Sequence, residues 1–278
     1  MLSYRHEYHA GNHADVVKHA VLALLIDALQ RKPTPIRVID SHAGTGVYDL
    51  TSREAQQHRE FAQGIARIVD ARPVPPELSR YVAAIEALND GDVLLKYPGS
   101  PQLARMLLRD GDHLELFELH PQACASLEAA FGRDRRVHIH RRDAFEGVPA
   151  VVPPPERRGL VLIDPAYERR EEFDRVLAML PALLERWPNG VYAVWYPLLR
   201  KPEARAFVRQ LRALEMPRPF QVELQVAPAG SFGLLGSGLV IANLPYGLDA
   251  QLKTVMPWLH RRLAPEGAGS WQARPLAP

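Results

Sequence analysis

Apolar runs rich in β-branched residues recur along the chain, and stretches with helical spacing lie between most of them. Five such runs, each of strand length, come first: 36–40, 113–119, 137–143, 159–164 and 191–196. Segments 122–131 and 171–187 between them have the spacing of amphipathic helices. Strands that alternate with helices predict a parallel sheet with helices on both faces.

The end of the chain departs from this alternation. Segments 220–227 and 239–243 both have the pattern of strands, and the glycine-rich stretch between them is too short for a crossover helix. The two strands are therefore expected to be antiparallel. An α/β sheet of five parallel strands followed by a terminal antiparallel hairpin is the arrangement of the Rossmann-like class I methyltransferases, by analogy of fold alone. The tail from Ala264 is short and rich in Pro, Gly and Ala, and it is expected to fray.

One connection is abnormally long. Residues 47–112 separate the turn after the first strand from the second strand, whereas a whole βαβ unit needs only about thirty residues. Segments 54–71 and 77–88 both have amphipathic helical spacing, and a proline-rich stretch separates them. We therefore expect a small helical insertion, residues 48–96, on a sheet domain formed by residues 1–47 and 97–278.

Composition narrows the class of protein without naming an activity. Of 278 residues, 47% are hydrophobic and 24% are charged, which excludes a disordered chain. The net charge of +2 does not by itself indicate a nucleic-acid binder. Cys124 has no second cysteine to pair with, and no apolar stretch near the N-terminus is long enough for a signal peptide or a membrane span. These features predict a cytoplasmic protein that does not enter a membrane.

Three predicted strands end in carboxylates, and a glycine turn follows the first of them. Gly44 and Gly46 come after Asp40, without the dinucleotide-binding spacing and without the lysine of a P-loop. A cofactor that lacks a pyrophosphate fits this turn best, with a purely structural turn as the alternative. Glu118, at the end of the second strand, is suited to accept hydrogen bonds from ribose hydroxyls, and Asp143, after the third, to meet an adenine amine.

The fourth strand leads directly into Asp164-Pro165-Ala166-Tyr167. This tetrapeptide resembles the Asp-Pro-Pro-Tyr motif of amino methyltransferases. The N6 amine of adenine is a poor nucleophile, because its lone pair is delocalised into the ring. The Asp164 carboxylate and the Pro165 carbonyl would accept its two N–H groups, Tyr167 would stack on the extruded base, and Asp164 would take the proton.

A second tetrapeptide, Asn243-Leu244-Pro245-Tyr246, resembles a related motif. It ends the last strand of the predicted hairpin, whereas the catalytic motif belongs at the end of the fourth strand. We therefore expect it to be structural.

The N-terminal region is rich in histidine. His6, His9, His13 and His19 have a spacing that fits no closed zinc site, and the cysteine is far away, so no metal is expected.

Arginines gather near the predicted catalytic loop, where they could contact phosphates or simply face solvent. They are Arg133, Arg135, Arg136, Arg141, Arg142, Arg169 and Arg170.

Motifs spread over nearly the whole chain resemble the bacterial 23S ribosomal RNA adenine-N6 methyltransferase J family. The most specific one is the N-terminal run 1–15. The others are Lys18-His19, His42-Ala43-Gly44, Tyr97-Pro98-Gly99-Ser100-Pro101, Glu118-Leu119-His120-Pro121, Trp195-Tyr196-Pro197 and Pro257-Trp258-Leu259-His260. The resemblance implies a monomeric enzyme that methylates one adenine of 23S rRNA. It leaves open whether free rRNA or an early assembly intermediate is the substrate.

The resemblance also implies roles for single residues. Asp164 would be the proton acceptor, Tyr4 would touch the RNA, and the roles of His19 and Ser100 rest on the resemblance alone. The residues expected to bind S-adenosylmethionine are Lys18, His19, His42, Gly44, Ser100, Glu118, Asp143, Ala144 and Asp164.

One position departs from the family pattern, because Ala166 stands where the motif has its second proline. The Pro165 carbonyl is retained, so we expect activity to be retained. Two alternatives are a DNA adenine methyltransferase, which usually needs a target-recognition domain, and a non-catalytic RNA-binding protein on the same scaffold. Glu118, Asp143, Asp164 and Tyr167 together speak against the second.

Overall fold

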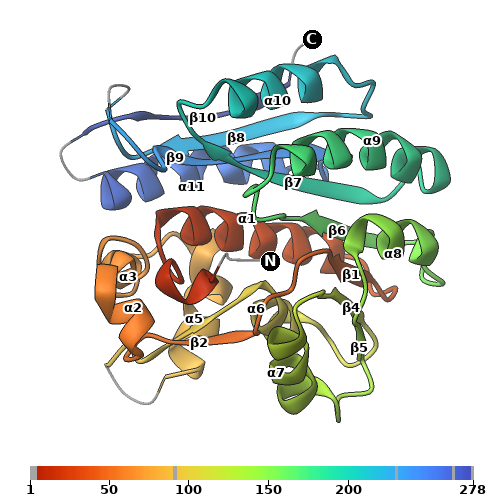
Figure 1. Cartoon of the computed structure of the whole chain (residues 1–278), viewed down its shortest axis with the longest axis horizontal. Helices are drawn as coiled ribbons and strands as arrows, with labels where there is room; N and C mark the ends of the chain where they lie inside the picture. The colour runs from red at the N-terminus through yellow and green to blue at the C-terminus, as the bar shows by residue number, and fades with distance from the viewer. Residues whose placement is uncertain (1–4, 90–92, 229–230, 265–266, 277–278) are drawn as a thin grey trace.

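The computed structural model describes residues 5–89, 93–228, 231–264 and 267–276. Within these residues, an eight-stranded sheet in the order β10-β8-β9-β7-β6-β1-β4-β5 forms the centre of the molecule (Figure 1). Its strands are β1 (Arg37–Asp40), β4 (His113–Phe117), β5 (Val137–His140), β6 (Gly159–Ile163), β7 (Val191–Leu198), β8 (Phe220–Gln225), β9 (Gly236–Ala242) and β10 (Ser270–Pro275).

Five neighbouring strands, β5-β4-β1-β6-β7, run parallel, as predicted. Asp40 at the end of β1 is in register with Leu116 on β4 and Leu162 on β6, so these strands end at one edge of the sheet. The connections carry α7 (Pro121–Phe131), α8 (Ala144–Val151), α9 (Arg170–Arg186) and α10 (Pro202–Ala213). The edge where the parallel strands end is where ligands bind in such sheets.

The antiparallel part of the sheet is larger than predicted. The β9 strand lies between β7 and β8 and is antiparallel to both, which confirms the predicted antiparallel pair. The expectation that the tail frays is wrong, because β10 pairs with β8 from Ser270 to Pro275 and buries Ala273 and Leu276. A proline is tolerated there because β10 is the outermost strand, where one row of N–H groups has no partner to meet.

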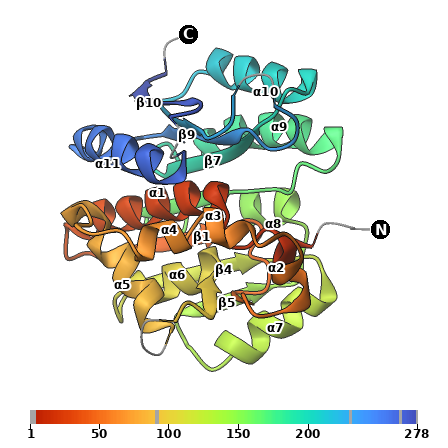
Figure 2. The same ribbon diagram turned by 90° about the vertical axis from the view of Figure 1, so that its left-hand side faces the viewer.

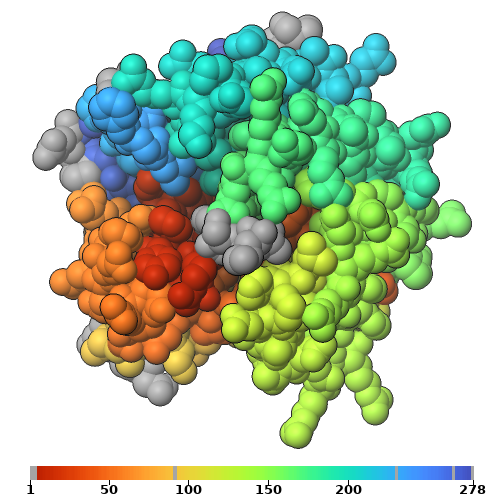
Figure 3. Space-filling view, in the orientation of Figure 1, coloured from red at the N-terminus to blue at the C-terminus, as the bar shows by residue number. Residues whose placement is uncertain are grey.

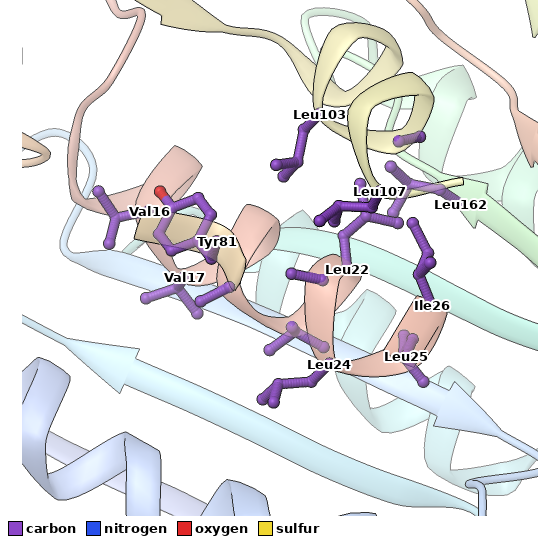
Figure 4. Packing of buried hydrophobic residues seen from close by; sticks show 14 of the residues in the cluster. Val16, Val17, Leu22, Leu24, Leu25, Ile26, Tyr81, Leu103, Leu107 and Leu162 are labelled. Atoms are coloured by element: carbon purple, nitrogen blue, oxygen red, sulfur yellow. The ribbon is translucent and has the colours of Figure 1, made fainter. Parts of the chain in front are cut away.

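The first long helix, α1 (His13–Gln30), is buried on nearly every side. Asn12 caps it by accepting the N–H groups of Ala14 and Asp15. One side packs on β9 and β6, and the other packs on α5 (Ser79–Ala87), α6 (Ser100–Leu107) and α11 (Leu248–Leu263). Figure 4 shows Leu22 and Ile26 of α1 packed beneath Leu107 of α6. Most residues of α1 are apolar and buried on every side, so the helix belongs to the core, where it lies between the sheet and α5 and α6.

The segment predicted to be an insertion, residues 48–96, contains shorter helices than predicted. In place of one helix over 54–71 there are α2 (Arg53–His58), α3 (Glu60–Gln63) and α4 (Ala66–Val69), which Figure 2 shows beside α1. The helix breaks at Arg59, which has a positive φ, and at Gly64. A Cβ on Gly64 would lie 2.1 Å from the carbonyl oxygen of Gly11, so this contact requires glycine. The short strands β2 (Val47–Asp49) and β3 (Lys96–Pro98) pair at the base of the insertion, and the 3-10 turns η1 (His6–Tyr8) and η2 (Pro76–Leu78) complete the set of elements.

None of the helices in the described ranges is long and apolar enough to cross a membrane.

Candidate active site

A cavity of about 1700 Å³ lies where the parallel strands end. Its walls come from the loops after β1, β4 and β6, the beginning of α8, and the segment that leads into α1. Figure 3 shows the N-terminal part of the chain, the insertion and the loops around α7 and α9 meeting on this face. Of the predicted site residues, the structure places Lys18, His19, His42, Gly44, Ser100, Glu118, Asp143, Ala144, Asp164, Pro165 and Tyr167 on the cavity wall. Tyr4, predicted to touch RNA, lies outside the described residues.

A buried ammonium group connects the predicted catalytic carboxylate to α1. The Nζ atom of Lys18 lies 2.7 Å from Oδ2 of Asp164 and 2.9 Å from Oδ1 of Asp15. Asp15 in turn accepts the N–H of Gly11 and lies 2.9 Å from Nε2 of His6. The side chains of Lys18 and Asp164 are 8% and 12% exposed, so these charges interact with little screening by water. In the part of the chain that the structure describes, this arrangement fixes Oδ2 of Asp164 and leaves Oδ1 for another donor.

Burial and charge shift the pKa values of this group in definite directions. Burial raises the pKa of Asp164 above its ordinary value, although Lys18 opposes the shift. Burial alone would lower the pKa of Lys18, but Asp15 and Asp164 raise it well above its usual range. Burial opposes ionisation of Asp15 as well, yet His6 and Lys18 hold its pKa well below the usual value. Lys18 is therefore a permanent cation, and Asp164 is a more basic carboxylate than one in water.

The rest of the motif forms a rigid turn. Tyr167 has a φ of 52°, its hydroxyl donates to the carbonyl oxygen of Trp195 over 2.7 Å, and its ring stacks on Phe173. Only 6% of Tyr167 is exposed, at the cavity wall. Pro165 is buried, and Ala166 is exposed. Contacts at Tyr167, two residues after Pro165, therefore supply stiffness that the missing proline would have given.

Glu118 supports the glycine turn. Its two carboxylate oxygens accept the N–H groups of Gly44, at 2.9 Å, and His120, at 2.7 Å. Gly44 has a φ of 65°, and a Cβ there would lie 2.5 Å from the Tyr48 hydroxyl, so the turn requires glycine. Each carboxylate oxygen accepts more than one hydrogen bond, so Glu118 retains lone pairs for a ligand.

Asp143 caps α8. Its Oδ1 accepts the N–H of Phe145 at 3.0 Å, and its Oδ2 lies 2.7 Å from the guanidinium of Arg175. Arg175 also covers the Phe145 ring, 4.1 Å from its centroid, and Ala144 is buried at the first position of the helix. These contacts hold Asp143, Phe145 and Arg175 together on the cavity wall, and Arg175 had no predicted role.

The cavity also contains two neutral histidines and a buried serine. Burial lowers the pKa of His42 to about 4 and that of His19 to about 3. His42 Nδ1 lies 2.7 Å from the hydroxyl of Ser41, and Ser100 begins α6. Burial raises the pKa of Asp40 to about 6, against a hydrogen bond from Ser100. Because their pKa values lie far below 7, the imidazole rings of His42 and His19 are neutral hydrogen-bonding groups near pH 7.

Three of the four N-terminal histidines hold this segment to the rest of the protein. His6 binds Asp15 as described, His9 Nδ1 lies 2.9 Å from Glu60 of the insertion, and His19 Nδ1 lies 2.7 Å from the hydroxyl of Tyr97. No cluster of three metal-ligating side chains occurs in the ranges that the structure describes.

The arginine cluster divides into structural and exposed members. Arg136 forms an ion pair with Asp134 and donates to the carbonyl of Leu108, so it supports the loop before β5. Arg142 and Arg169 lie on the rim of the cavity. Phosphate contact therefore remains a hypothesis for the rim arginines.

The second tetrapeptide lies away from the cavity. Asn243 donates to the carbonyl oxygens of Pro188, at 2.6 Å, and Gly190, at 2.8 Å. Because β9 is antiparallel to β7, it ends at the opposite edge of the sheet. In the structure Asn243 holds a turn, as the structural interpretation predicts.

Besides Arg175, two other groups at this site had no predicted role. Asp15 orients Lys18, and Trp195 accepts the Tyr167 hydroxyl and donates from Nε1 to Ser237. In the sequence, Asp15 has the pattern of an ordinary acidic residue in the first turn of a helix. Only its contacts in the structure show that it belongs to this site. Trp195 belongs to the motif Trp195-Tyr196-Pro197, but nothing in the spacing of that motif indicates a contact with Tyr167.

The sheet order and a cavity at the ends of the parallel strands define a Rossmann-like class I methyltransferase fold. A model of the family described as "Ribosomal RNA large subunit methyltransferase D, RlmJ" matches residues 33–276. The chain therefore belongs to this family of ribosomal RNA methyltransferases, which confirms the resemblance.

Individual relatives agree over the full length of the chain. It is 41% identical over 270 residues to "Ribosomal RNA large subunit methyltransferase J" of Escherichia coli, covering 97% of this chain and 96% of that protein. It is 40% identical over 280 residues to the Haemophilus influenzae protein of the same name, covering both completely. A crystal structure of protein LPL1258 from Legionella pneumophila superposes with a TM-score of 0.90 at 34% identity, over 96% of this chain and 98% of that one.

Proposed function

We propose that this protein transfers a methyl group from S-adenosylmethionine to the N6 amine of one adenine in 23S rRNA. The observation that carries the proposal is the buried carboxylate of Asp164, at the end of β6, held on one oxygen by Lys18. The names of the curated relatives support ribosomal RNA as the substrate class.

The polar groups of the cavity fit S-adenosylmethionine. The Glu118 carboxylate is suited to ribose hydroxyls, and the Asp143 carboxylate and the Phe145 ring on the cavity wall are suited to an adenine. Nε2 of His19 is buried without a hydrogen-bond partner among the described residues, as expected of a group that meets a ligand. His42, Gly44, Ser100 and Ala144 would complete the cofactor site. When bound, the cofactor supplies an electrophilic methyl group on a positively charged sulfur.

Asp164 would orient the amine and then take its proton. In our proposal Oδ1 accepts one N–H of the adenine amine and the Pro165 carbonyl accepts the other, which turns the nitrogen lone pair toward the methyl group. A nitrogen–carbon bond forms as the sulfur–carbon bond breaks, and the surplus proton passes to Asp164. A raised pKa makes this carboxylate a better acceptor for the proton than a carboxylate in water.

Tyr167 would serve as the platform for the extruded base. Its hydroxyl is held by Trp195 and one ring face is occupied by Phe173, so a base would meet a ring that is already fixed. A fixed ring loses little entropy when a base stacks on it.

Replacement of Asp164 by alanine tests the mechanism. We expect transfer to fall by at least about 100-fold, because orientation and proton acceptance are both lost, while S-adenosylmethionine still binds in calorimetry. The matched control is Asp174→Ala, an exposed aspartate on α9, which should behave as wild type. Equal activity of Asp164→Ala and wild type would refute the mechanism.

The substrate is tested by incubating the enzyme with labelled cofactor and separate pools of protein-free 23S rRNA, ribosomal particles and DNA. We expect label on one adenine N6 of the rRNA after mapping by mass spectrometry. Label in DNA alone would support the DNA alternative, and binding of RNA without any label would support the non-catalytic one.

A further inference from the structure

The hydroxyl groups of two buried tyrosines connect the insertion with a histidine of the cavity. Tyr81 lies on α5 and Tyr97 on β3, and both are 0% exposed. Their oxygens are 3.1 Å apart, and the Tyr97 oxygen is 2.7 Å from Nδ1 of His19. Figure 4 shows Tyr81 lying across α1 beside Val16 and Val17. The three polar groups form one hydrogen-bonded chain that ends at the cavity wall.

The protons of the two hydroxyls give this chain a direction. A tyrosine hydroxyl has one proton to donate, and a buried donor without an acceptor is more costly than an unused lone pair. In the described part of the chain, the Tyr97 oxygen is the hydrogen-bonding partner of the Tyr81 hydroxyl, so Tyr81 donates to Tyr97. Tyr97 is then left to donate its own proton to Nδ1 of His19.

A neutral histidine that accepts at Nδ1 carries its proton on Nε2. His19 is 1% exposed, and burial lowers its pKa to about 3, so its ring is neutral near pH 7. Its Nε2 atom is buried without a partner among the described residues, and the residue lines the cavity. The ring therefore presents an N–H group that lacks an acceptor among the described residues.

The position of His19 indicates the chemistry of that acceptor. Glu118 and Asp143 are hydrogen-bond acceptors. Glu118 suits the ribose hydroxyls of a nucleoside, and Asp143 suits its amine. His19 lines the same cavity and offers an N–H donor, whereas the Lys18 ammonium is already paired with Asp15 and Asp164. Because Glu118 and Asp143 would hold the nucleoside part of S-adenosylmethionine, its methionyl part is left for His19, and the carboxylate is the hydrogen-bond acceptor of that part.

We propose that Tyr97, directed by Tyr81, is a positioning residue that fixes His19 as its Nε2–H tautomer, and that this N–H donates to the methionyl carboxylate of S-adenosylmethionine. The identity of the ligand rests on the proposed function, whereas the tautomer follows from the protein alone. The predicted insertion, residues 48–96, thereby takes part in cofactor binding through Tyr81, which directs Tyr97 and does not touch the cofactor.

The tautomer can be measured without any ligand. In protein labelled with ¹⁵N-histidine, the long-range ¹H–¹⁵N spectrum should show His19 with an unprotonated Nδ1 and a protonated Nε2, assigned by loss of the signals in His19→Gln. In Tyr97→Phe, which keeps the ring stacked on His19, the signals should move toward a mixture of tautomers. A wild-type spectrum with Nδ1 protonated would overturn the proposal.

Binding measurements test the acceptor. Tyr97→Phe should raise the Kd for S-adenosylhomocysteine about tenfold and the KM for S-adenosylmethionine likewise, with kcat at saturating cofactor within about twofold. Tyr81→Phe should have a smaller effect on both constants. In this variant Tyr97 can still donate its proton to His19 and loses only the hydrogen bond from Tyr81. Binding of 5′-methylthioadenosine, which has no methionyl carboxylate, should be the same in wild type and Tyr97→Phe.

The matched control is Tyr192→Phe, which also removes a fully buried hydroxyl, one that donates to the Leu183 carbonyl in a separate part of the core. It should change neither the Kd nor the His19 spectrum. A Kd for Tyr97→Phe within twofold of wild type, or an equal loss of 5′-methylthioadenosine binding, would overturn the assignment of the carboxylate. Failure of wild-type protein to bind S-adenosylmethionine at all would instead refute the proposed function, and the tautomer result would identify which of the two had failed.

Discussion

Lys18 lies between two buried carboxylates, and only Asp164 belongs to the methyltransferase motif. The other, Asp15, is on the same helix as Lys18 and has no contact with Asp164 of its own. Its negative charge nevertheless acts on Asp164, because in a buried site charges interact over several ångströms with little screening. The basicity of Asp164, the proposed proton acceptor, thus depends on Asp15, which acts on it without touching it.

Asp15→Asn should therefore change the pH dependence of the reaction. Asp164 must be ionised to accept a proton, so activity falls as the pH drops through its pKa. Removing the charge of Asp15 leaves Lys18 less opposed and lowers the pKa of Asp164, so the acidic limb of kcat/KM should move to lower pH. The weaker base and the less firmly held Lys18 should reduce kcat about tenfold.

A pH–rate profile of this variant beside Asp134→Asn checks the prediction. Asp134 also forms ion pairs, with Arg105 and Arg136, but it does not line the cavity, so its variant should keep the wild-type profile. An acidic limb that stays in place or moves to higher pH in Asp15→Asn would contradict our account.

Ala166→Pro should change kcat by less than about threefold. Ala166 is exposed, and the turn around it is already held by the contacts of Tyr167, so the lost stiffness of a second proline is largely replaced. Methylation of protein-free 23S rRNA by the two proteins compares them directly. A wild-type enzyme that is inactive until proline is introduced would show that the prediction is wrong.

Among the elements, the strands with β-branched apolar runs could be predicted because their pattern is local. The broken helix of the insertion could not, since its break depends on Gly64 meeting Gly11, more than fifty positions earlier. The site divides in the same way. Glu118 and Asp164 could be predicted, because both directly follow a strand that is visible in the sequence. The ion pair of Lys18 with Asp164 joins residues 146 apart, and no local pattern encodes such a distance.

The turn after β1 is the element most sensitive to a single methyl group. Gly44→Ala would force an alanine into the left-handed region and place its Cβ against the Tyr48 hydroxyl. We expect the free energy of unfolding to fall by about 2 kcal/mol and the affinity for S-adenosylmethionine to weaken. Thermal denaturation and calorimetry measure the two effects.

Gly111→Ala is the control for this substitution. A Cβ at Gly111 would meet no atom closer than 3.9 Å, so stability and affinity should stay near wild type. An equal effect of the two substitutions would mean that the Gly44 turn is not under the constraint described.

At the scale of the whole molecule, the outer edge of the sheet is formed by β10. The prolines and glycines around it predicted a frayed tail and not a strand. In the structure β10 pairs with β8 at six positions and adds Ala273 and Leu276 to the core. Without it, the next strand would present unpaired N–H and C=O groups to other chains.

Removal of residues 268–278 should therefore lower the Tm by about 5 °C or more and promote aggregation. Scanning calorimetry and light scattering on the shortened protein test this expectation, with the full chain as reference. An unchanged Tm would support the original expectation of a frayed tail.

The burial of α1 has a consequence for how the protein is made. Ala14 at the start of α1 accepts a hydrogen bond from Ser237 of β9, a residue 223 positions later. During synthesis the helix emerges early, while the strand that covers one of its apolar sides is among the last to leave the ribosome. Until then the nascent chain exposes the apolar residues of this helix, so we expect it to rely on chaperones and to fold mainly after translation.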